Sequence, residues 1–133
     1  MKKTIMNPVG IAPPVSNYSH AVQVETGDTA FIFVAGQIAL DVNGNLVGEN
    51  DIGMQTEFVF EQIATILKAV DGSLRDVVKA NIYVRDMSDY AKVAEVRNRY
   101  FAEAPPATTF VEVSRLAREG WLVEIEVVAA IQK

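Results

Sequence analysis

The feature that most constrains the fold is a strict alternation of apolar and polar residues near the middle of the chain. Within residues 76–85, Val78, Ala80, Ile82 and Val84 alternate with Lys79, Asn81, Tyr83 and Arg85. Successive side chains of a β-strand point to opposite faces, so this pattern predicts a strand with one core face and one polar face. One face of the sheet that contains this strand is therefore expected to pack against the hydrophobic core.

Further strands are predicted on both sides of this segment. Residues 20–25 and 29–35 are rich in β-branched and aromatic residues and are separated by a Thr-Gly-Asp turn, which is typical of a hairpin. The Asn43-Gly44 pair between short apolar flanks predicts a tight turn with positive φ values. Two more strands are expected over 108–113 and 122–131, joined by a loop that contains Gly120.

Two helices are predicted between the strands. Apolar residues recur at steps of three and four over 51–70, and Gly72 is expected to stop that helix. Ser88 is the expected N-cap of a second helix that runs to about Phe101, with Asp89 near the positive end of its dipole. This order of elements predicts an α/β domain with both helices packed on one face of a mixed sheet. Other subunits are expected to cover the second face.

Composition supports one compact domain spanning residues 1–133. Half of the residues are hydrophobic and 22% are charged, which excludes an extended disordered chain. Apolar residues in excess of what so small a core can hold are expected at a subunit interface. No apolar run approaches the ~20 residues of a membrane helix, and the first residues do not resemble a signal peptide, so we expect a soluble cytoplasmic protein.

The residue types exclude several kinds of site. Without cysteine the chain has no disulfide, no thiolate metal ligand and no cysteine nucleophile, and the single histidine, His20, cannot build a zinc site, so no metal is expected. His20 is expected to be a surface or hydrogen-bonded residue rather than a proton donor. The net charge of −5 makes nucleic acid an improbable partner, and the basic residues at 97–99 are interpreted as part of a mixed-charge helix face.

Three segments together resemble one known family. The stretch DVVKANIYVRDMSDY at 76–90, with AGQI at 35–38 before it and VEIE at 123–126 after it, resembles the RidA/YjgF family, which also carries the older name endoribonuclease L-PSP. The likeness spans nearly the whole chain. It implies a chorismate-mutase-like homotrimer with about six strands in each mixed sheet and with small-molecule clefts at the subunit interfaces.

The resemblance also implies a reaction. The well-studied branch of the family hydrolyses enamines and imines such as 2-aminoacrylate to 2-keto acids and ammonia without a cofactor. By resemblance, Glu124 positions the attacking water, Tyr18 lies near the cleft, and the backbone of Gly36 and Gln37 faces the ligand. The alternatives are a solvated strand carboxylate at Glu124, ordinary packing of Tyr18 and a turn requirement at Gly36.

Several positions depart from the pattern of the deaminating branch. Thr108, followed by Thr109, stands where that branch has the arginine that binds the substrate carboxylate, so by resemblance these two threonines are expected to be ligand-binding residues. A hydroxyl cannot replace the bidentate arginine. Ala35 replaces a serine and Ala94 replaces an asparagine, so two more polar groups are missing from the expected ligand-binding positions. These losses predict a changed ligand or lost catalysis.

The loop at 115–121 offers substitutes for the missing cation. Arg115 or Arg118 could reach a cleft, although surface arginines are common in such loops. Trp121 is expected to pack against a neighbour rather than to bind ligand. Three functions therefore remain open: a deaminating hydrolase, a trimeric ligand-binding or regulatory protein without catalysis, and, only through the older family name, an endoribonuclease.

Overall fold

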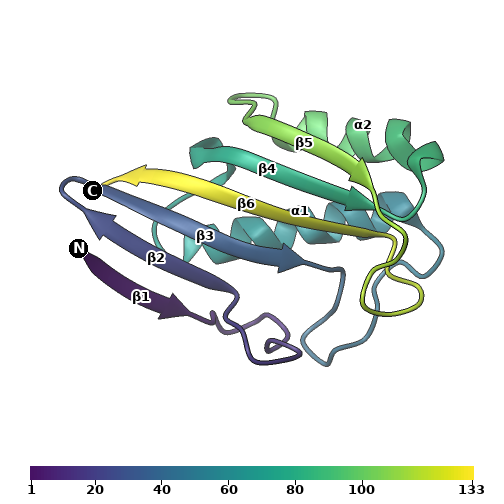
Figure 1. Ribbon diagram of the computed structural model, residues 1–133, viewed down its shortest axis with the longest axis horizontal. Coiled ribbons are helices and arrows are strands. Elements are labelled where there is room, and N and C mark those ends of the chain that lie inside the picture. The colour runs from purple at the N-terminus through teal and green to yellow at the C-terminus, as the bar shows by residue number, and fades with distance from the viewer.

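The computed structural model describes residues 1–133 and places six strands in one layer, with two helices against one side of it (Figure 1). The strands are β1 Lys2–Met6, β2 Ala21–Thr26, β3 Thr29–Gln37, β4 Val77–Val84, β5 Ala107–Glu112 and β6 Val123–Gln132. The helices are α1 Ile52–Lys68 and α2 Tyr90–Tyr100, and two short 3-10 turns are η1 Leu74–Asp76 and η2 Met87–Asp89. The predicted architecture of a mixed sheet with both helices on one face is confirmed.

The sheet is mixed because one neighbouring pair of strands is parallel. Its order is β1-β2-β3-β6-β4-β5, and only β4 and β5 run parallel to each other. Parallel neighbours need a crossover connection, and α2 supplies it. The C-terminal strand β6 therefore lies between β3 and β4, at the centre of the sheet.

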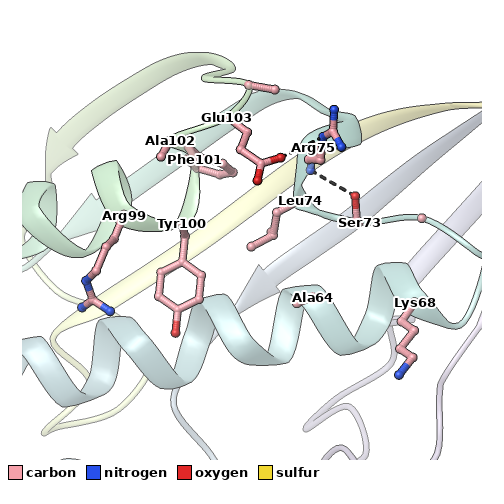
Figure 2. Close-up of a pocket in the computed structure, with 12 residues that line it drawn as sticks. Ala64, Lys68, Ser73, Leu74, Arg75, Arg99, Tyr100, Phe101, Ala102 and Glu103 are labelled. Atoms are coloured by element: carbon pink, nitrogen blue, oxygen red, sulfur yellow. Dashed lines mark hydrogen bonds and ion pairs between the residues drawn. The ribbon is translucent and has the colours of Figure 1, made fainter.

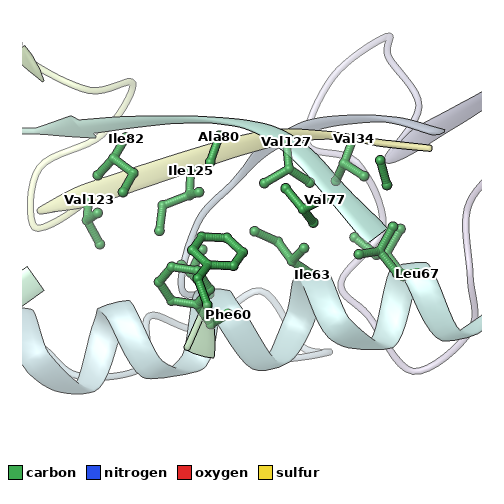
Figure 3. Packing of buried hydrophobic residues seen from close by; sticks show 14 of the residues in the cluster. Val34, Phe60, Ile63, Leu67, Val77, Ala80, Ile82, Val123, Ile125 and Val127 are labelled. Atoms are coloured by element: carbon green, nitrogen blue, oxygen red, sulfur yellow. The ribbon is translucent and has the colours of Figure 1, made fainter. Parts of the chain in front are cut away.

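The core lies between the sheet and α1 (Figure 3). Phe60, Ile63 and Leu67 on the helix have no exposed surface, and they face Ile82 and Ile125 of the sheet, which have none either. The helical period of three to four and the strand period of two thus bring both apolar faces into the same layer. The alternation predicted for residues 76–85 appears as β4, with Ala80, Ile82 and Val84 buried.

The ends of α1 depend on specific side chains. Asp51 caps its first turn by accepting a hydrogen bond of 3.0 Å from the N–H of Met54. The helix ends at Lys68, and the left-handed conformation after it belongs to Asp71, with φ of 60°, rather than to Gly72. Gly72 has a packing role instead, because a Cβ at this position would overlap the side chain of Ile131.

The prediction that Ser88 caps the second helix is wrong. Asp86 comes first and accepts a hydrogen bond of 2.9 Å from the N–H of Ser88, which begins the 3-10 turn η2. This turn occupies the residues that the prediction assigned to the helix start, so α2 begins only at Tyr90. Asp86 thus caps the 3-10 turn, and Asp89 occupies the N-cap position of α2 without a side-chain capping hydrogen bond.

The far side of the sheet carries exposed apolar side chains. Ile5 of β1 and Phe33 of β3 flank Val22 in one cross-strand row, and they are 63% and 48% exposed. Val111 on the edge strand β5 is also exposed and lies beside Tyr83. We call this side the open face. No helix of the chain has both the length and the apolar character needed to cross a membrane.

Candidate functional site

Glu124 lies on the open face, near the start of β6. Its chain neighbours Val123 and Ile125 are fully buried on the helix side, so the strand alternation turns Glu124 outward. Across the sheet it is paired with Tyr83 of β4, and on its other side β3 carries a bulge that includes Gly36. A Cβ on Gly36 would overlap the carboxylate of Glu124, so a larger residue here would displace this side chain from its present position.

The surroundings of Glu124 favour its protonated form. Burial raises the pKa of Glu124, and the negative charge of Glu126, two residues along the same face, raises it further. Glu126 itself accepts hydrogen bonds from Asn81 Nδ2 at 3.1 Å and from the Tyr83 hydroxyl. The hydrogen bond to Glu126 and burial raise the pKa of Tyr83 to about 12, so its hydroxyl stays protonated and keeps donating. Glu124 is thus a carboxyl group of raised pKa beside a carboxylate with fixed hydrogen-bond partners.

Tyr18, Gly36 and Gln37 line one small hollow of about 20 Å³. Gly36 borders this hollow and also touches Glu124, so it connects the two halves of the site. The ring of Tyr18 is 40% exposed and lies edge-on to His20, with 6.4 Å between the ring centroids. The structure therefore brings four of the six predicted site residues together.

The side chain of Gln37 belongs to a buried hydrogen-bond network. Its Nε2 donates to the carbonyl of Ala35 at 3.0 Å and approaches His20 Nδ1 at 3.3 Å, while its Oε1 accepts from Gln62 at 2.8 Å. His20 Nε2 lies 2.6 Å from the carbonyl of Ala12, so we assign the ring proton to Nε2 and the acceptor role to Nδ1. His20 is the hydrogen-bonded residue that the sequence predicted, and the side chain of Gln37 is held in place by this network.

Sequence reasoning did not find Gln62. It lies on α1 and is only 9% exposed. Its amide reaches Gln37, 25 positions away in the chain. A polar residue that pairs across such a distance leaves no local signal in the sequence.

The two predicted threonines lie apart from Glu124. Thr109 is on the open face and accepts a hydrogen bond of 2.8 Å from Lys79. Thr108 is paired with Ala80, which faces the helices, and its hydroxyl donates to the carbonyl of Pro106 at 3.1 Å. It lines a cavity of about 390 Å³ beside α2. Within the chain, Thr108 and Glu124 therefore point to opposite sides of the sheet.

The arginines considered as substitutes for the missing cation do not lie beside Thr108. The guanidinium of Arg118 lies over the ring of Trp121, 5.5 Å from its centroid, and Arg115 is exposed in the same loop. Trp121 is 3% exposed and packs against Ile38 and Leu40 in a second apolar cluster, as predicted.

A larger cavity of about 470 Å³ lies on the helix side, between η1, α1 and the end of α2 (Figure 2). Both arginines in its wall have acidic partners: Arg75 pairs with Glu103 at 3.1 Å, and Arg99 pairs with Glu57 at 3.1 Å. None of the predicted site residues lines this cavity. The chain holds no group of three acidic or histidine side chains that could bind a metal ion.

Comparison with known proteins identifies the family. The family described as Endoribonuclease L-PSP matches residues 10–131, and the chain belongs to this family, which is also called RidA/YjgF. A RutC family protein of Pyrococcus abyssi is 44% identical over 116 residues, which is 87% of each chain. The Acinetobacter baylyi protein named 3-aminoacrylate deaminase RutC is 36% identical over 131 residues, covering 98% of this chain and all of the relative.

Solved structures agree with the fold. A putative endoribonuclease of Thermotoga maritima superposes with a TM-score of 0.87 at 36% identity and covers both chains completely. RidA from an Antarctic Psychrobacter superposes with a TM-score of 0.84 at 35% identity, covering 96% of this chain and 99% of that one. The sheet, its strand order and the two helices therefore represent the family fold.

Proposed function

We propose that the protein is a cofactor-independent hydrolase that deaminates an enamine, an imine or a related reactive metabolite. The observation that carries this proposal is Glu124, a partly buried carboxyl group of raised pKa that lies against Gly36 on the open face. Carboxyl groups of this kind serve as general acids and bases near neutral pH. The relative that is named as a 3-aminoacrylate deaminase supports the same class of reaction.

In the proposed reaction Glu124 accepts a proton from a water molecule while the water oxygen adds to the imine carbon. Glu124 then passes this proton to the nitrogen, which gives a carbinolamine. The hydroxyl proton of the carbinolamine moves to the same nitrogen through Glu124, the carbon–nitrogen bond breaks as the carbon–oxygen double bond forms, and a carbonyl compound and ammonia leave. An enamine first takes a proton on carbon to become the imine. The hollow beside Gly36 has about 20 Å³, which is room for one water molecule.

We further propose that the active clefts form between subunits of a homotrimer. Thr108 and Glu124 point to opposite sides of one sheet, so they can share a cleft only if they come from different copies. The exposed apolar row that includes Ile5 and Phe33 provides a surface that a second copy would cover.

The charged substitution Phe33→Asp is expected to break the trimer, because an ionised carboxylate cannot be buried at an apolar interface without a partner. Sedimentation or light scattering should give the mass of a single 14.6 kDa subunit for the variant and about three times that mass for the wild type. Met54→Asp is the control, because Met54 is 51% exposed at the start of α1, away from the open face. A wild-type mass of one subunit would refute the trimer.

Ammonia release tests the reaction directly. With 2-aminoacrylate generated in situ and with a panel of imines that lack a carboxylate, we expect at least one substrate to react in proportion to protein concentration. A rate equal to the uncatalysed rate for every substrate would exclude the hydrolase. The panel also shows whether the substrate must carry a carboxylate.

The losses at Ala35, Ala94 and Thr108 favour a second candidate, a trimeric ligand-binding or regulatory protein without catalysis. The single change Thr108→Arg separates the two candidates. If it creates deaminase activity in a protein that has none, the natural protein is a binding protein. Efficient deamination by the unchanged protein would exclude this candidate.

A further inference from the structure

The cavity beside Thr108 contains a cation and an amide that the family pattern does not predict at these positions. Ala94, at the position where an asparagine was expected, is only 8% exposed and offers no polar group. Arg97 and Asn98 follow it by three and four residues, which places them one turn further along the same side of α2. Both line the cavity of about 390 Å³ that also includes Thr108.

Arg97 has no acidic partner. Its Nε donates to Asn98 Oδ1 at 3.2 Å, and its guanidinium lies 5.8 Å from the centroid of the Tyr90 ring, which helps to hold it. None of the ion pairs in the chain includes Arg97, whereas Arg99 on the same helix is paired with Glu57. The terminal nitrogens of Arg97 thus remain available to an anion.

The rest of the cavity wall suits an anionic ligand with a small apolar body. No acidic residue lines it, although the chain as a whole carries a net charge of −5. Phe101, Pro105 and Pro106 supply apolar surface, and the amide of Asn98 adds a further donor. A carboxylate is the group that a guanidinium binds best, through two parallel hydrogen bonds.

We propose that Arg97, assisted by Asn98, binds the carboxylate of a 2-imino or enamino acid in this protein. By resemblance, the family has a cation on the strand where this chain has Thr108, and an amide on the helix where it has Ala94. In this proposal Arg97 and Asn98, one turn further along α2, supply the cation and the amide instead. This inference rests on the proposed function, because that function puts the Thr108 cavity in the active cleft. It makes Arg97 a specificity-determining residue that preserves selectivity for carboxylates.

Binding of pyruvate, the 2-keto acid that 2-aminoacrylate yields, tests Arg97 without depending on turnover. We expect the wild type to bind pyruvate in calorimetric or NMR titration and to bind its methyl ester at least tenfold more weakly. Arg97→Ala should weaken pyruvate binding at least tenfold and leave the ester unchanged. In the double variant Arg97→Ala/Thr108→Arg, the strand arginine should restore pyruvate binding to within about threefold of the wild type.

Arg99→Ala is the matched control, because it removes an equal charge from the same helix but outside this cavity. It should change pyruvate binding less than twofold, and the melting temperature of each variant verifies folding. Equal losses in Arg97→Ala and Arg99→Ala, or no pyruvate binding by the wild type, would overturn the inference. If pyruvate binding depends on Arg97 but no imine is hydrolysed, the role of Arg97 stands and the hydrolase proposal fails.

Discussion

The substitution Glu124→Gln is expected to lower kcat for imine hydrolysis by about 10²–10⁴-fold, because the amide cannot accept the proton of the attacking water. Folding should be retained. Glu124 has a raised pKa in the folded state, so its ionisation costs stability as pH rises through that pKa. The glutamine variant lacks this cost and should be at least as stable as the wild type at neutral pH. Ammonia release and thermal unfolding measured on the same samples check both expectations.

The pH profile distinguishes a reacting carboxyl group from a merely structural one. Wild-type activity should fall as pH drops through the raised pKa of Glu124, because the base becomes protonated. Glu126→Gln removes the neighbouring negative charge but keeps an oxygen that can accept from Asn81 and Tyr83. The acidic limb of its profile should therefore shift to lower pH. An unchanged limb in Glu126→Gln, or full activity in Glu124→Gln, would contradict the role of Glu124.

The substitution Phe60→Ala is expected to lower the free energy of unfolding by about 3–5 kcal/mol. Phe60 has no exposed surface, stacks on Tyr100 with 5.0 Å between ring centroids and meets Phe101 edge-on at 5.2 Å. Its removal leaves a cavity where α1, α2 and the sheet meet. Because a domain of this kind is stable by only about 5–15 kcal/mol, much of its stability should be lost in urea denaturation.

Tyr100→Phe provides the control for this experiment. It keeps the stacked ring and removes only the hydroxyl, which bonds Glu61 at 2.7 Å on the exposed surface. Tyr100→Phe should lower the free energy of unfolding by about 1 kcal/mol or less. A loss in Phe60→Ala as small as that in Tyr100→Phe would show that this contact is not central to the core.

Most strands and both helices could be predicted because their side chains repeat with a local period. Residues 76–85 alternate so regularly that β4 lies within one residue of the predicted segment. β1 was not predicted because Lys2–Met6 shows no such alternation, and its existence depends on pairing with β2, where Thr4 lies opposite Gln23. An edge strand of this kind forms because the neighbouring strand has backbone N–H and C=O groups without partners. The sequence of the edge strand itself does not reveal this.

The sequence by itself determined the periodicities, the family segments and the identity of Glu124 as the acid to test, since each of these is local. Tertiary structure alone decided that Gly36 leaves room for Glu124, that Gln62 reaches Gln37 and that Arg97 shares a cavity with Thr108. These contacts join residues that lie 11 to 88 positions apart in the chain, and only the packed sheet and helices set their distances.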